Sequence, residues 1–479
     1  TKQSIRRKQK EQLPTCLITT PESLSLMLAD PKFRDKFKSL ESIIIDEWHE
    51  LLSSKRGVQT ELCLARLKRF FPDLRIWGMS ATIGNLQEAC DVLCGPTHLH
   101  RKIIKGVSDK KIEIETLYPD EMETYPWSGH LGLHLIDKVI EKIHPARSVL
   151  LFTNTRSQTE MWYQAILEKR PDWAGQIALH HGSLDREIRE FVEQGLKVGI
   201  LRLVVATSSL DLGVDFSPVD LVIQVGSPKG VARIIQRAGR SGHSPGLPSK
   251  IVAVPTNSLE IIEFAAVKDA IRDRKIESRP PLDSPLDLLA QHLTTLSIGG
   301  GFRKEEMFEE IKLTFAYQNL SSDEFNEVLE FISNTGPMLQ AYPEFVKVII
   351  EDGVYKIADR TKARMHVMSI GTISADPMLS VKFVTGKRLG AVEESFASRL
   401  KKGDVFVFSG RTLEFIRIRE LEVQVKAAEG KKPLVPRWGG GRMPLSTQLS
   451  ANMRLKLEEA QNNVYASIEM QEIMPVLEF

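Results

Sequence analysis

The sequence has few cysteines, no excess of one charge and no long hydrophobic run. Its 479 residues include four cysteines, too few for a disulfide framework, so they indicate a reducing compartment. Lysine and arginine total 64 against 62 acidic residues, so any nucleic-acid surface must be a local groove. No stretch reaches the roughly 20 apolar residues of a membrane span, and none has a signal-peptide pattern. We expect a cytoplasmic protein without a membrane partner.

The remaining composition is that of a globular protein with several domains. Hydrophobic residues make up 42% and charged residues 26% of the chain, and its length predicts roughly three or four domains. The chain opens with Thr1 and a basic run to Lys10. We interpret it as a fragment of a longer protein.

The most informative stretch is Ile43–His49, a β-branched run that ends in two acidic residues. Such a run predicts a buried parallel strand with carboxylates at its carboxyl end, where open α/β sheets bind ligands. Asp46 could hold Mg²⁺ while Glu47 orients and deprotonates a water, and His49 could link them to a neighbouring segment. The alternative is a core strand followed by an acidic helix cap.

Further strands and helices alternate on both sides of this stretch. Cys16–Thr20 predicts a strand, and Thr20, Pro21 and Ser23 predict a turn that holds a phosphate or only caps a helix. A helix is expected up to Arg69, and Arg75–Thr82 predicts a strand that ends in Ser80 and Thr82. This alternation is typical of a doubly wound α/β domain.

After a linker over Lys105–His130, the sequence predicts a second α/β domain. Its strands are Ser148–Thr155, Ile177–Ser183, Leu201–Thr207, Leu221–Val225 and Lys250–Pro255, and its helices Arg156–Lys169, Glu187–Gly195 and Gly230–Gly239.

Beyond Arg279 the pattern changes. Three amphipathic helices, followed by a hairpin, predict a winged helix; they are Asp287–Leu296, Lys304–Phe315 and Ser322–Ser333, with the hairpin in Phe345–Ile350 and Gly353–Ala358. Alternating strands from Ser380 predict a small antiparallel barrel or sheet whose basic face includes Arg417 and Arg419. Leu445–Ala460 predicts a helix.

A zinc site at Cys90, Cys94, His98 and His100 is the less favoured interpretation. Cys90 and Cys94 are in phase with apolar residues of a helix, and the paired Cys-x-x-Cys spacing of structural zinc sites is absent. We expect core cysteines.

A second charged string, Gln236–His243, combines Gln236, Arg237 and Arg240 at a helix end with Gly242. Arginines supplied from a facing domain stabilise the charge on a transferring phosphoryl group. One such string could be a solvated helix end. Four such segments in this order are not expected by chance; they are Asp46–His49, Ser80–Thr82, Ala206–Asp215 and Gln236–His243.

Together these segments resemble a superfamily 2 helicase, and within it the large helicase-related (Lhr) group in its bacterial ligase-associated DEXH-box form. The segments that carry the resemblance are Thr20–Ser23, Asp46–His49, Ser54–Gln59, Ser80–Thr82, Phe152–Arg156, His180–Ser183, Thr207–Asp215, Gln236–His243 and Pro436–Pro444.

The resemblance implies an α/β fold with tandem RecA-like parallel-sheet domains, the first incomplete, then a winged helix and a small β-barrel/helical domain. It implies domains at 1–105, 106–278, 279–365 and 366–479. It also implies roles for single residues. Asp46 and Glu47, with His49, would bind Mg²⁺ and activate water, and Ser80 and Thr82 would couple hydrolysis to motion. The residues implied to sense ATP are Asp211, Gly213, Gln236, Arg237 and Arg240, and those implied to contact the strand backbone are Thr20, Pro21, Ser23, Asn154, Arg156, Gly182, Ser183 and Thr207.

Two departures from the family pattern matter. Many relatives have a second arginine where this chain has His243, so Arg240, with or without Arg237, must stabilise the γ-phosphate. No Gly-x-x-x-x-Gly-Lys-Ser/Thr motif is present, and we expect this phosphate loop before Thr1. A chain without it should be inactive alone.

We therefore expect an ATP-dependent and Mg²⁺-dependent translocase that travels 3′-to-5′ on single-stranded DNA in repair, and unwinds DNA or RNA–DNA duplexes. Other DNA-repair proteins are candidate partners. The alternatives are a non-catalytic nucleic-acid-binding scaffold and a duplex remodeller. Trp438, in a glycine-rich loop beside Arg437, is expected to stack on an unpaired base or, alternatively, to fill the seam between the barrel and the helices.

Overall fold

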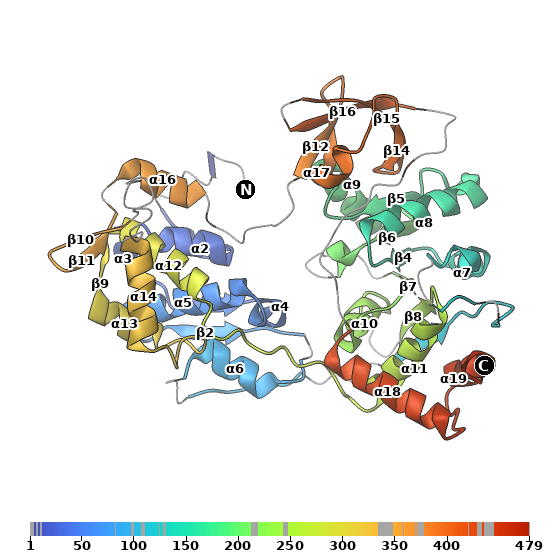
Figure 1. The fold of residues 1–479 in the computed structure, drawn as a ribbon, viewed down its shortest axis with the longest axis horizontal. Helices are drawn as coiled ribbons and strands as arrows, with labels where there is room; N and C mark the ends of the chain where they lie inside the picture. Colours follow the sequence, from blue (N-terminus) through green and yellow to red (C-terminus); the bar gives the residue numbers. More distant parts are fainter. Residues whose placement is uncertain are drawn as a thin grey trace. The chain divides into compact units, whose positions relative to one another are not determined.

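The computed structural model describes residues 4–5, 8–9, 12–81, 83–96, 100–106, 111–123, 125–127, 131–211, 219–242, 248–333, 348–357, 359–368, 370, 378–419, 421–428, 434 and 445–478. The chain forms two compact units (Figure 1). Unit 1 comprises Thr1–Gly106 and Ser278–Ile373, and unit 2 comprises Val107–Glu277 and Ser374–Phe479. The division into four domains stays a prediction.

Unit 1 combines an α/β segment with a helical segment that carries a small antiparallel sheet. The first segment contains α2 (Pro21–Leu28), α3 (Phe33–Lys36), β1 (Ser42–Ile45), α4 (Trp48–Leu52), α5 (Lys55–Phe70), β2 (Arg75–Gly78) and α6 (Leu86–Cys94). The second contains α12 (Leu286–Ile298), β9 (Phe302–Arg303), α13 (Lys304–Ile311), α14 (Ser322–Ser333), β10 (Ile349–Glu351), β11 (Val354–Lys356) and α16 (Arg360–Met368).

The two strands of the α/β segment, β1 and β2, pair in parallel with Ile43 opposite Ile76, which confirms both predicted strands. The predicted strand Cys16–Thr20 is wrong. No strand is assigned over these residues, which are all described, and Ile18 is 94% exposed. An apolar, β-branched run favours a strand only where a neighbouring strand accepts and donates its backbone hydrogen bonds, and this stretch pairs with no strand in the described part of unit 1.

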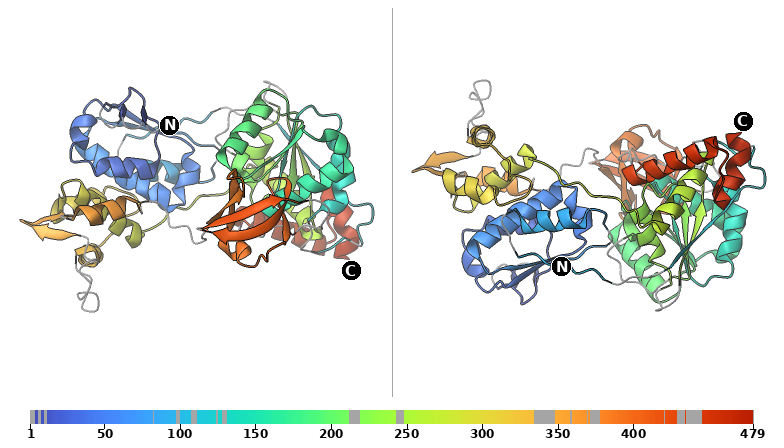
Figure 2. Two further views of the ribbon diagram at one scale, coloured as in Figure 1. Left: turned by 90° about the horizontal axis from the view of Figure 1, so that it is seen from above. Right: turned by 90° about the horizontal axis from the view of Figure 1, so that it is seen from below.

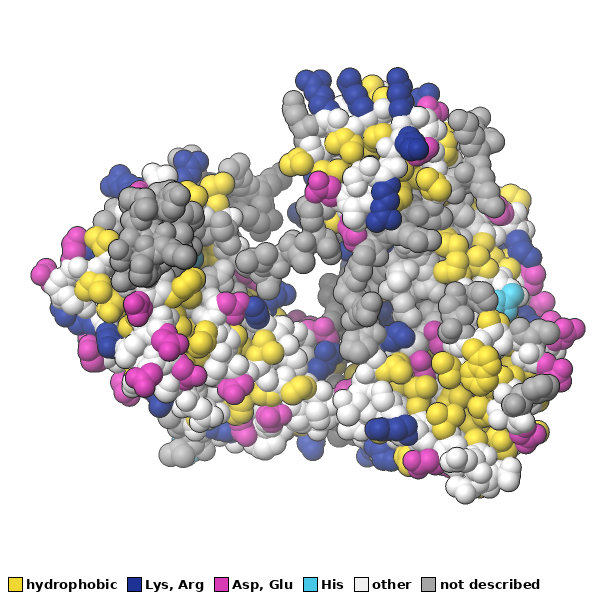
Figure 3. Space-filling model, viewed as in Figure 1, with side chains coloured by type: hydrophobic (Ala, Val, Ile, Leu, Met, Phe, Trp, Pro, Cys, Tyr) yellow, Lys and Arg dark blue, Asp and Glu magenta, His cyan; other side chains and the backbone are white. Residues whose placement is uncertain are grey.

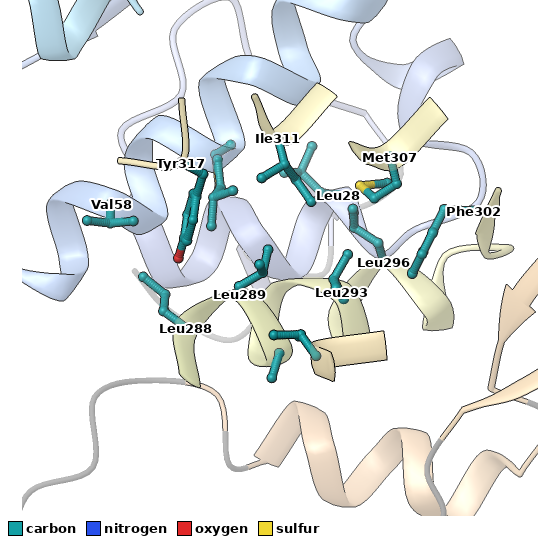
Figure 4. Close-up of a cluster of buried hydrophobic side chains, with 14 of the residues drawn as sticks. Leu28, Val58, Leu288, Leu289, Leu293, Leu296, Phe302, Met307, Ile311 and Tyr317 are labelled. Carbon is teal, nitrogen blue, oxygen red and sulfur yellow. The ribbon is translucent and has the colours of Figure 1, made fainter. Parts of the chain in front are cut away.

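The core of unit 1 joins its two segments. In Figure 4, Leu289 and Leu293 of α12 face Val58 of α5 and Tyr317, and all four side chains are buried. The three predicted helices and the hairpin are confirmed, and β9 adds a third antiparallel strand to the hairpin in the order β10-β11-β9. The winged helix therefore shares one apolar core with the strand that carries Asp46.

Unit 2 contains a parallel sheet whose described strands lie in the order β3-β8-β7-β4-β6-β5. The strands are β3 (Ile112–Thr116), β4 (Val149–Phe152), β5 (Ile177–His180), β6 (Leu203–Ala206), β7 (Leu221–Val225) and β8 (Ser249–Val254). The helical segments around it are η1 (Leu133–Leu135), α7 (Ile136–Ile143), α8 (Arg156–Lys169), η2 (Pro171–Trp173), α9 (Arg186–Lys197), η3 (Ser208–Leu210), α10 (Val231–Ala238) and α11 (Ser258–Arg272).

The second predicted α/β domain is confirmed in type and order, with one error. The stretch predicted as a linker contains β3, an edge strand that pairs in parallel with β8. Glu113 and Glu115 alternate with isoleucines and are more exposed than a central strand allows. Charged alternation over five residues between turn-forming segments is a weak strand signal, which explains the wrong prediction.

The carboxyl-terminal part of unit 2 begins with a second sheet, here named the curled sheet. It consists of β12 (Met378–Phe383), β13 (Arg388–Glu393), β14 (Val405–Phe408), β15 (Arg411–Arg419) and β16 (Glu422–Ala427), with the short helix α17 (Glu394–Ala397). Their order is β13-β12-β16-β15-β14, and β12 pairs with β16 in parallel. The prediction of an antiparallel barrel or sheet is wrong at that pair. Among the described residues no ladder joins β13 to β14, so the sheet is an open half-barrel.

Two helices close the described chain, α18 (Thr447–Gln461) and α19 (Ile468–Leu477). Figures 1 and 2 show both alongside α11, where Met470 and Ile473 bury against Ile261. Within the residues described, no helix has the length and apolar character needed to cross a membrane.

Candidate functional site

Asp46 and Glu47 form the turn that leads from β1 into α4. Glu47 has a left-handed backbone, with φ of 50°, and its N–H donates to Asp46 Oδ1 at 2.9 Å. A non-glycine residue in this conformation costs about 1–3 kcal/mol and is found most often at functional sites. Asp46 is exposed, and the Glu47 side chain is 38% exposed. The two carboxylates are therefore available to a ligand at the carboxyl end of the strand.

His49 joins this turn to the end of β2. Its side chain is 2% exposed, and its Nδ1 accepts the Ala81 N–H at 3.3 Å. Glu47 Oε2 lies 3.5 Å from Nδ1, and Glu50 Oε1 lies 3.6 Å from Nε2. Burial lowers the pKa of His49, against the opposing effect of Glu50 and Glu47. A neutral ring with its proton on Nε2 accepts the Ala81 N–H at Nδ1 and directs its own N–H toward Glu50. His49 therefore contacts the segment that follows β2, and its role in catalysis stays a prediction.

The segment that His49 reaches is the predicted pair Ser80 and Thr82. Ser80 is exposed and its Oγ donates to Ala81 O at 2.9 Å, whereas Thr82 lies outside the described residues. Trp48 fixes the same corner, because its backbone N–H donates to Met79 O at 2.9 Å and its Nε1 donates to Ala89 O at 2.8 Å. The end of β2 and α6 are therefore both joined to α4 by direct hydrogen bonds.

Sequence reasoning missed two residues around His49. Arg279 Nη2 donates to Glu50 Oε1 at 3.2 Å, and the backbone N–H of Arg279 donates to Asn85 Oδ1 at 2.8 Å. Glu50 is adjacent to the predicted histidine, so its carboxylate was a local signal. Arg279 lies far along the chain, where no local pattern points to it.

In unit 2, Arg237 of α10 lies inside the fold with 1% of its side chain exposed. Its Nε and Nη2 donate to Asp211 Oδ1 and Oδ2 at 2.8 and 3.1 Å, and its Nη1 donates to Gln224 Oε1. The guanidinium also lies over the Phe152 ring, 4.5 Å from its centroid. Three of the five N–H donors of this buried guanidinium therefore already have partners, and direct contact of Arg237 with ATP stays a prediction.

Arg240 follows the end of α10 and is only partly buried. Its Nη2 donates to Asp211 O at 2.6 Å, and its own carbonyl accepts the Val219 N–H at 3.2 Å. Gln236 is also partly buried. Asp211 thus holds Arg237 by its carboxylate and Arg240 by its carbonyl. Gly213 and His243 lie outside the described residues.

The start of α10 is fixed by an acid that the sequence did not reveal. Glu277, 9% exposed, accepts the N–H groups of Val231 and Ala232, the latter at 2.8 Å. Ser446 Oγ donates to the same carboxylate at 2.9 Å. A carboxylate at a helix N-terminus satisfies unpaired donors and the helix dipole, so this contact sets the position of the helix that carries the arginines.

The predicted strand-binding residues of unit 1 lie at the start of α2. Thr20 caps the helix by accepting the Ser23 N–H at 3.4 Å, and Pro21 occupies the first helical position. Thr20 is exposed. The structure therefore shows the capping role, and phosphate binding at this site stays a prediction.

In unit 2 the structure brings some predicted strand-binding residues to the carboxyl ends of β4, β5 and β6, and it buries one. Gly182 is exposed, Arg156 and Thr207 are partly buried, and Asn154 Nδ2 donates to Ser227 O at 2.7 Å. Burial lowers the pKa of Arg156.

Ser183 is 5% exposed, and its carbonyl accepts the Ala391 N–H of β13 at 2.9 Å. The curled sheet therefore covers Ser183, and contact of this residue with a nucleic-acid strand stays a prediction. Trp438 lies outside the described residues. Cys90 and Cys94, discussed above as core residues, lie one turn apart in α6 and are partly buried.

Three family models match the chain in succession. They are the DEAD/DEAH box helicase at residues 1–89, the helicase conserved C-terminal domain at 133–244 and the Large helicase-related protein, winged helix domain, at 269–435.

Curated relatives and solved structures agree with these matches. ATP-dependent helicase Lhr-Core protein 2 of Thermococcus barophilus is 34% identical over 467 residues, which cover 96% of this chain and 54% of the relative. ATP-dependent helicase Lhr-Core of Methanocaldococcus jannaschii is 34% identical over 99% of this chain and 54% of its own. The chain thus spans about half the length of these relatives. The structure of Mycobacterium smegmatis helicase Lhr bound to ssDNA and AMP-PNP is similar over 100% of this chain and 59% of that chain, with 25% identity and a TM-score of 0.73.

Proposed function

The chain carries the DEAD/DEAH-box, helicase C-terminal and winged helix domains of a Lhr-family helicase, and from this premise we propose that it acts in an ATP-driven motor on single-stranded DNA. The observation that carries the proposal is the Asp46–Glu47 turn, whose His49 is hydrogen-bonded to the Ala81 N–H at the end of β2. A carboxylate pair tied to a second strand end can relay changes around a bound nucleotide to the rest of the unit.

The residues of this turn suit nucleotide hydrolysis. Asp46 offers exposed carboxylate oxygens, the ligand type that Mg²⁺ prefers, and bound Mg²⁺ would neutralise charge on phosphate oxygens. Glu47 would accept the proton of the attacking water. Arg240 would stabilise the charge that develops on the transferred phosphate, and Arg237 would position Asp211 and the end of α10.

Hydroxyl, amide and backbone groups suit a strand's phosphates, because they position the backbone and do not read base sequence. We assign this role to Thr20, Asn154, Arg156, Gly182 and Thr207. The buried Ser183 would support the neighbouring Gly182. The solved relative bound to single-stranded DNA supports DNA as the track. Travel in the 3′-to-5′ direction, unwinding of DNA or RNA–DNA duplexes, a role in repair, a cytoplasmic location and kinship with the bacterial ligase-associated form are further parts of the proposal.

The decisive experiment replaces Glu47 by glutamine in the natural protein. Glu47→Gln should lower ATP turnover by about 10²–10⁴-fold, the usual contribution of a general base, while binding of a non-hydrolysable ATP analogue with Mg²⁺ persists. Glu41→Gln, an exposed acid before β1, is the matched control and should turn over ATP normally.

A strand-displacement assay on duplexes with a 3′ or a 5′ single-stranded tail then distinguishes the motor from a scaffold and a remodeller. Unwinding of the 3′-tailed duplex only, lost in Glu47→Gln, supports the motor and its direction. Normal turnover in Glu47→Gln contradicts the assignment of the base. Strand binding without any turnover in the wild type indicates a scaffold, and turnover with duplex sliding but no strand separation indicates a remodeller.

A further inference from the structure

Unit 2 contains a pocket of about 660 Å³ between the parallel sheet and the curled sheet. Its floor is apolar and is formed by Leu179 of β5 and by Leu184, Ile188 and Val192, which lie before and along α9. Phe191 stands at its rim and is 71% exposed. β5 is an edge strand of the parallel sheet. The pocket uses none of the residues assigned to ATP or to the strand.

The walls of the pocket are fixed by buried contacts. Glu160 of α8, 0% exposed, accepts the Ser409 and Gly410 N–H groups of the β14–β15 turn at 2.7 and 3.0 Å. On the β13 side, the Asp185 N–H donates to Leu389 O at 3.0 Å. A Cβ on Gly410 would lie 2.9 Å from Tyr163 Cε1, so the turn approaches α8 as closely as glycine allows. The pocket is therefore preformed, which lowers the entropic cost of binding a ligand.

The rim carries cations on the side of the curled sheet. Lys387, Arg388 and Arg411 line it there, and Asp185 and Glu187 line it on the α9 side. Arg388 Nε lies 3.5 Å from Asp185 Oδ2. Lys387 and Arg411 make no ion pair with any residue that the structure describes. They therefore remain available to an anionic group of a ligand.

Several other cations of the curled sheet have polar partners. Figure 3 shows Lys and Arg side chains gathered over β15 and β16. Arg417 Nε donates to Gln424 Oε1 at 2.8 Å, Lys426 pairs with Glu414 at 3.0 Å and Lys382 pairs with Glu422. Lys387 and Arg411 differ from these residues because they line the pocket and are exposed.

We infer that this pocket is a docking site for a short segment of a partner protein. The segment places a bulky apolar side chain on the aliphatic floor beside Phe191, and acidic residues beside Lys387 and Arg411. A buried apolar anchor with a charged rim is the usual plan of such interfaces. A nucleic-acid strand fits less well, because Asp185 and Glu187 repel its phosphates and the aliphatic floor offers bases little to bond.

The test selects binders from a displayed library of random peptides on the whole chain, without ATP or DNA. Enriched sequences should combine acidic residues with a bulky apolar residue, and fluorescence anisotropy should then give their affinities. Phe191→Ala and the double change Lys387→Glu with Arg411→Glu should each weaken binding by about tenfold or more, as truncation of an interface anchor does. All three positions are exposed, so the fold should be retained.

Two matched controls complete the experiment. Val198→Ala, just after α9, and Lys401→Glu with Lys402→Glu, on the curled sheet, are exposed and outside the pocket, and should leave binding unchanged. The inference is overturned if the selection enriches no common sequence, if the enriched sequences are basic, or if the peptides bind the pocket variants as tightly as the wild type. Displacement of the peptides by a short oligothymidylate, with loss of its binding in the pocket variants, assigns the pocket to the DNA strand instead. These readouts need no ATP turnover, so they fail independently of the proposed function.

Discussion

The charged groups at the strand ends of unit 1 are open to solvent, whereas those beside α10 in unit 2 are largely buried. Asp46 is exposed and Glu47 partly so, but Asp211 is 5% and Arg237 1% exposed. The comparison separates charges that can meet a ligand from charges that hold the site in place.

Within unit 2 the same contrast distinguishes two arginines three residues apart. Arg237 is buried and donates three hydrogen bonds to Asp211 and Gln224, while Arg240 lies beyond the helix end and is only partly buried. We therefore assign chemistry to Arg240 and positioning to Arg237.

The largest effect is expected for Arg240→Ala. If Arg240 stabilises the transferring phosphate, turnover in the natural protein should fall by about 10³–10⁵-fold, as for arginine fingers, with little change in the free energy of unfolding. ATP hydrolysis and denaturant unfolding measure the two quantities. Arg272→Ala, on the exposed surface of α11, is the control. Normal turnover in Arg240→Ala would mean that another residue stabilises the transferring phosphate.

For Arg237→Ala we expect the opposite result, a large loss of folding stability and a smaller loss of ATP turnover than in Arg240→Ala. Removal of one partner of a buried ion pair should lower the free energy of unfolding by about 3–5 kcal/mol, because buried Asp211 then keeps only the longer contact with Arg233, whose Nε lies 3.7 Å from Asp211 Oδ2. Arg237→Met combined with Asp211→Leu should recover part of that loss, since no charge then remains buried. Urea unfolding of both variants provides the measurement. An Arg237→Ala protein with wild-type stability and the catalytic loss of Arg240→Ala would restore the direct contact with ATP.

The assignment of the arginines also shows where sequence reasoning succeeds and where it stops. The carboxylate pair and the link through His49 were predictable, because Asp46, Glu47 and His49 are adjacent and follow a clear strand pattern. The burial of Arg237 was not, because it depends on Gln224 and Asp211, which other strands bring to α10. Ser183 looked accessible for the same reason: the sheet that covers it begins far along the chain.

The register of the strands and the identity of their pairing partners could not be predicted from the sequence either. The helices and most strands followed from apolar periodicity, and α8 and β7 have the predicted bounds. Periodicity identifies a strand but not its neighbour. The parallel pairing of β12 with β16, the edge strand β3 and the unpaired stretch at Ile18 depend on which segments meet in space.

The last prediction concerns one buried acid in each unit. In unit 1, Glu61 of α5 is 4% exposed and accepts the Ala316 N–H at 3.0 Å. Burial raises the pKa of Glu61 to about 8, against the opposing effect of hydrogen bonds from the Ala316 and Phe315 backbone. In unit 2, burial raises the pKa of Glu263 to about 7.

Because both pKa values are higher in the folded state, the folded chain holds protons that the unfolded chain has lost. Each acid therefore contributes stability that is complete below its ordinary pKa and is lost as pH rises, up to about pH 8 for Glu61 and about pH 7 for Glu263. The slope is at most about 1.4 kcal/mol per pH unit for one proton.

Glu61→Gln and Glu263→Gln should flatten the fall in urea-unfolding free energy over these two windows, while Glu327→Gln, on the exposed side of α14, should not. Glutamine keeps the size of the side chain and can still accept the Ala316 N–H, so lost packing does not explain a change in slope. If Glu61→Gln retains the wild-type slope between about pH 5 and pH 8, Glu61 is ionised in the folded chain, and the burial of unpaired acids is not common to both units.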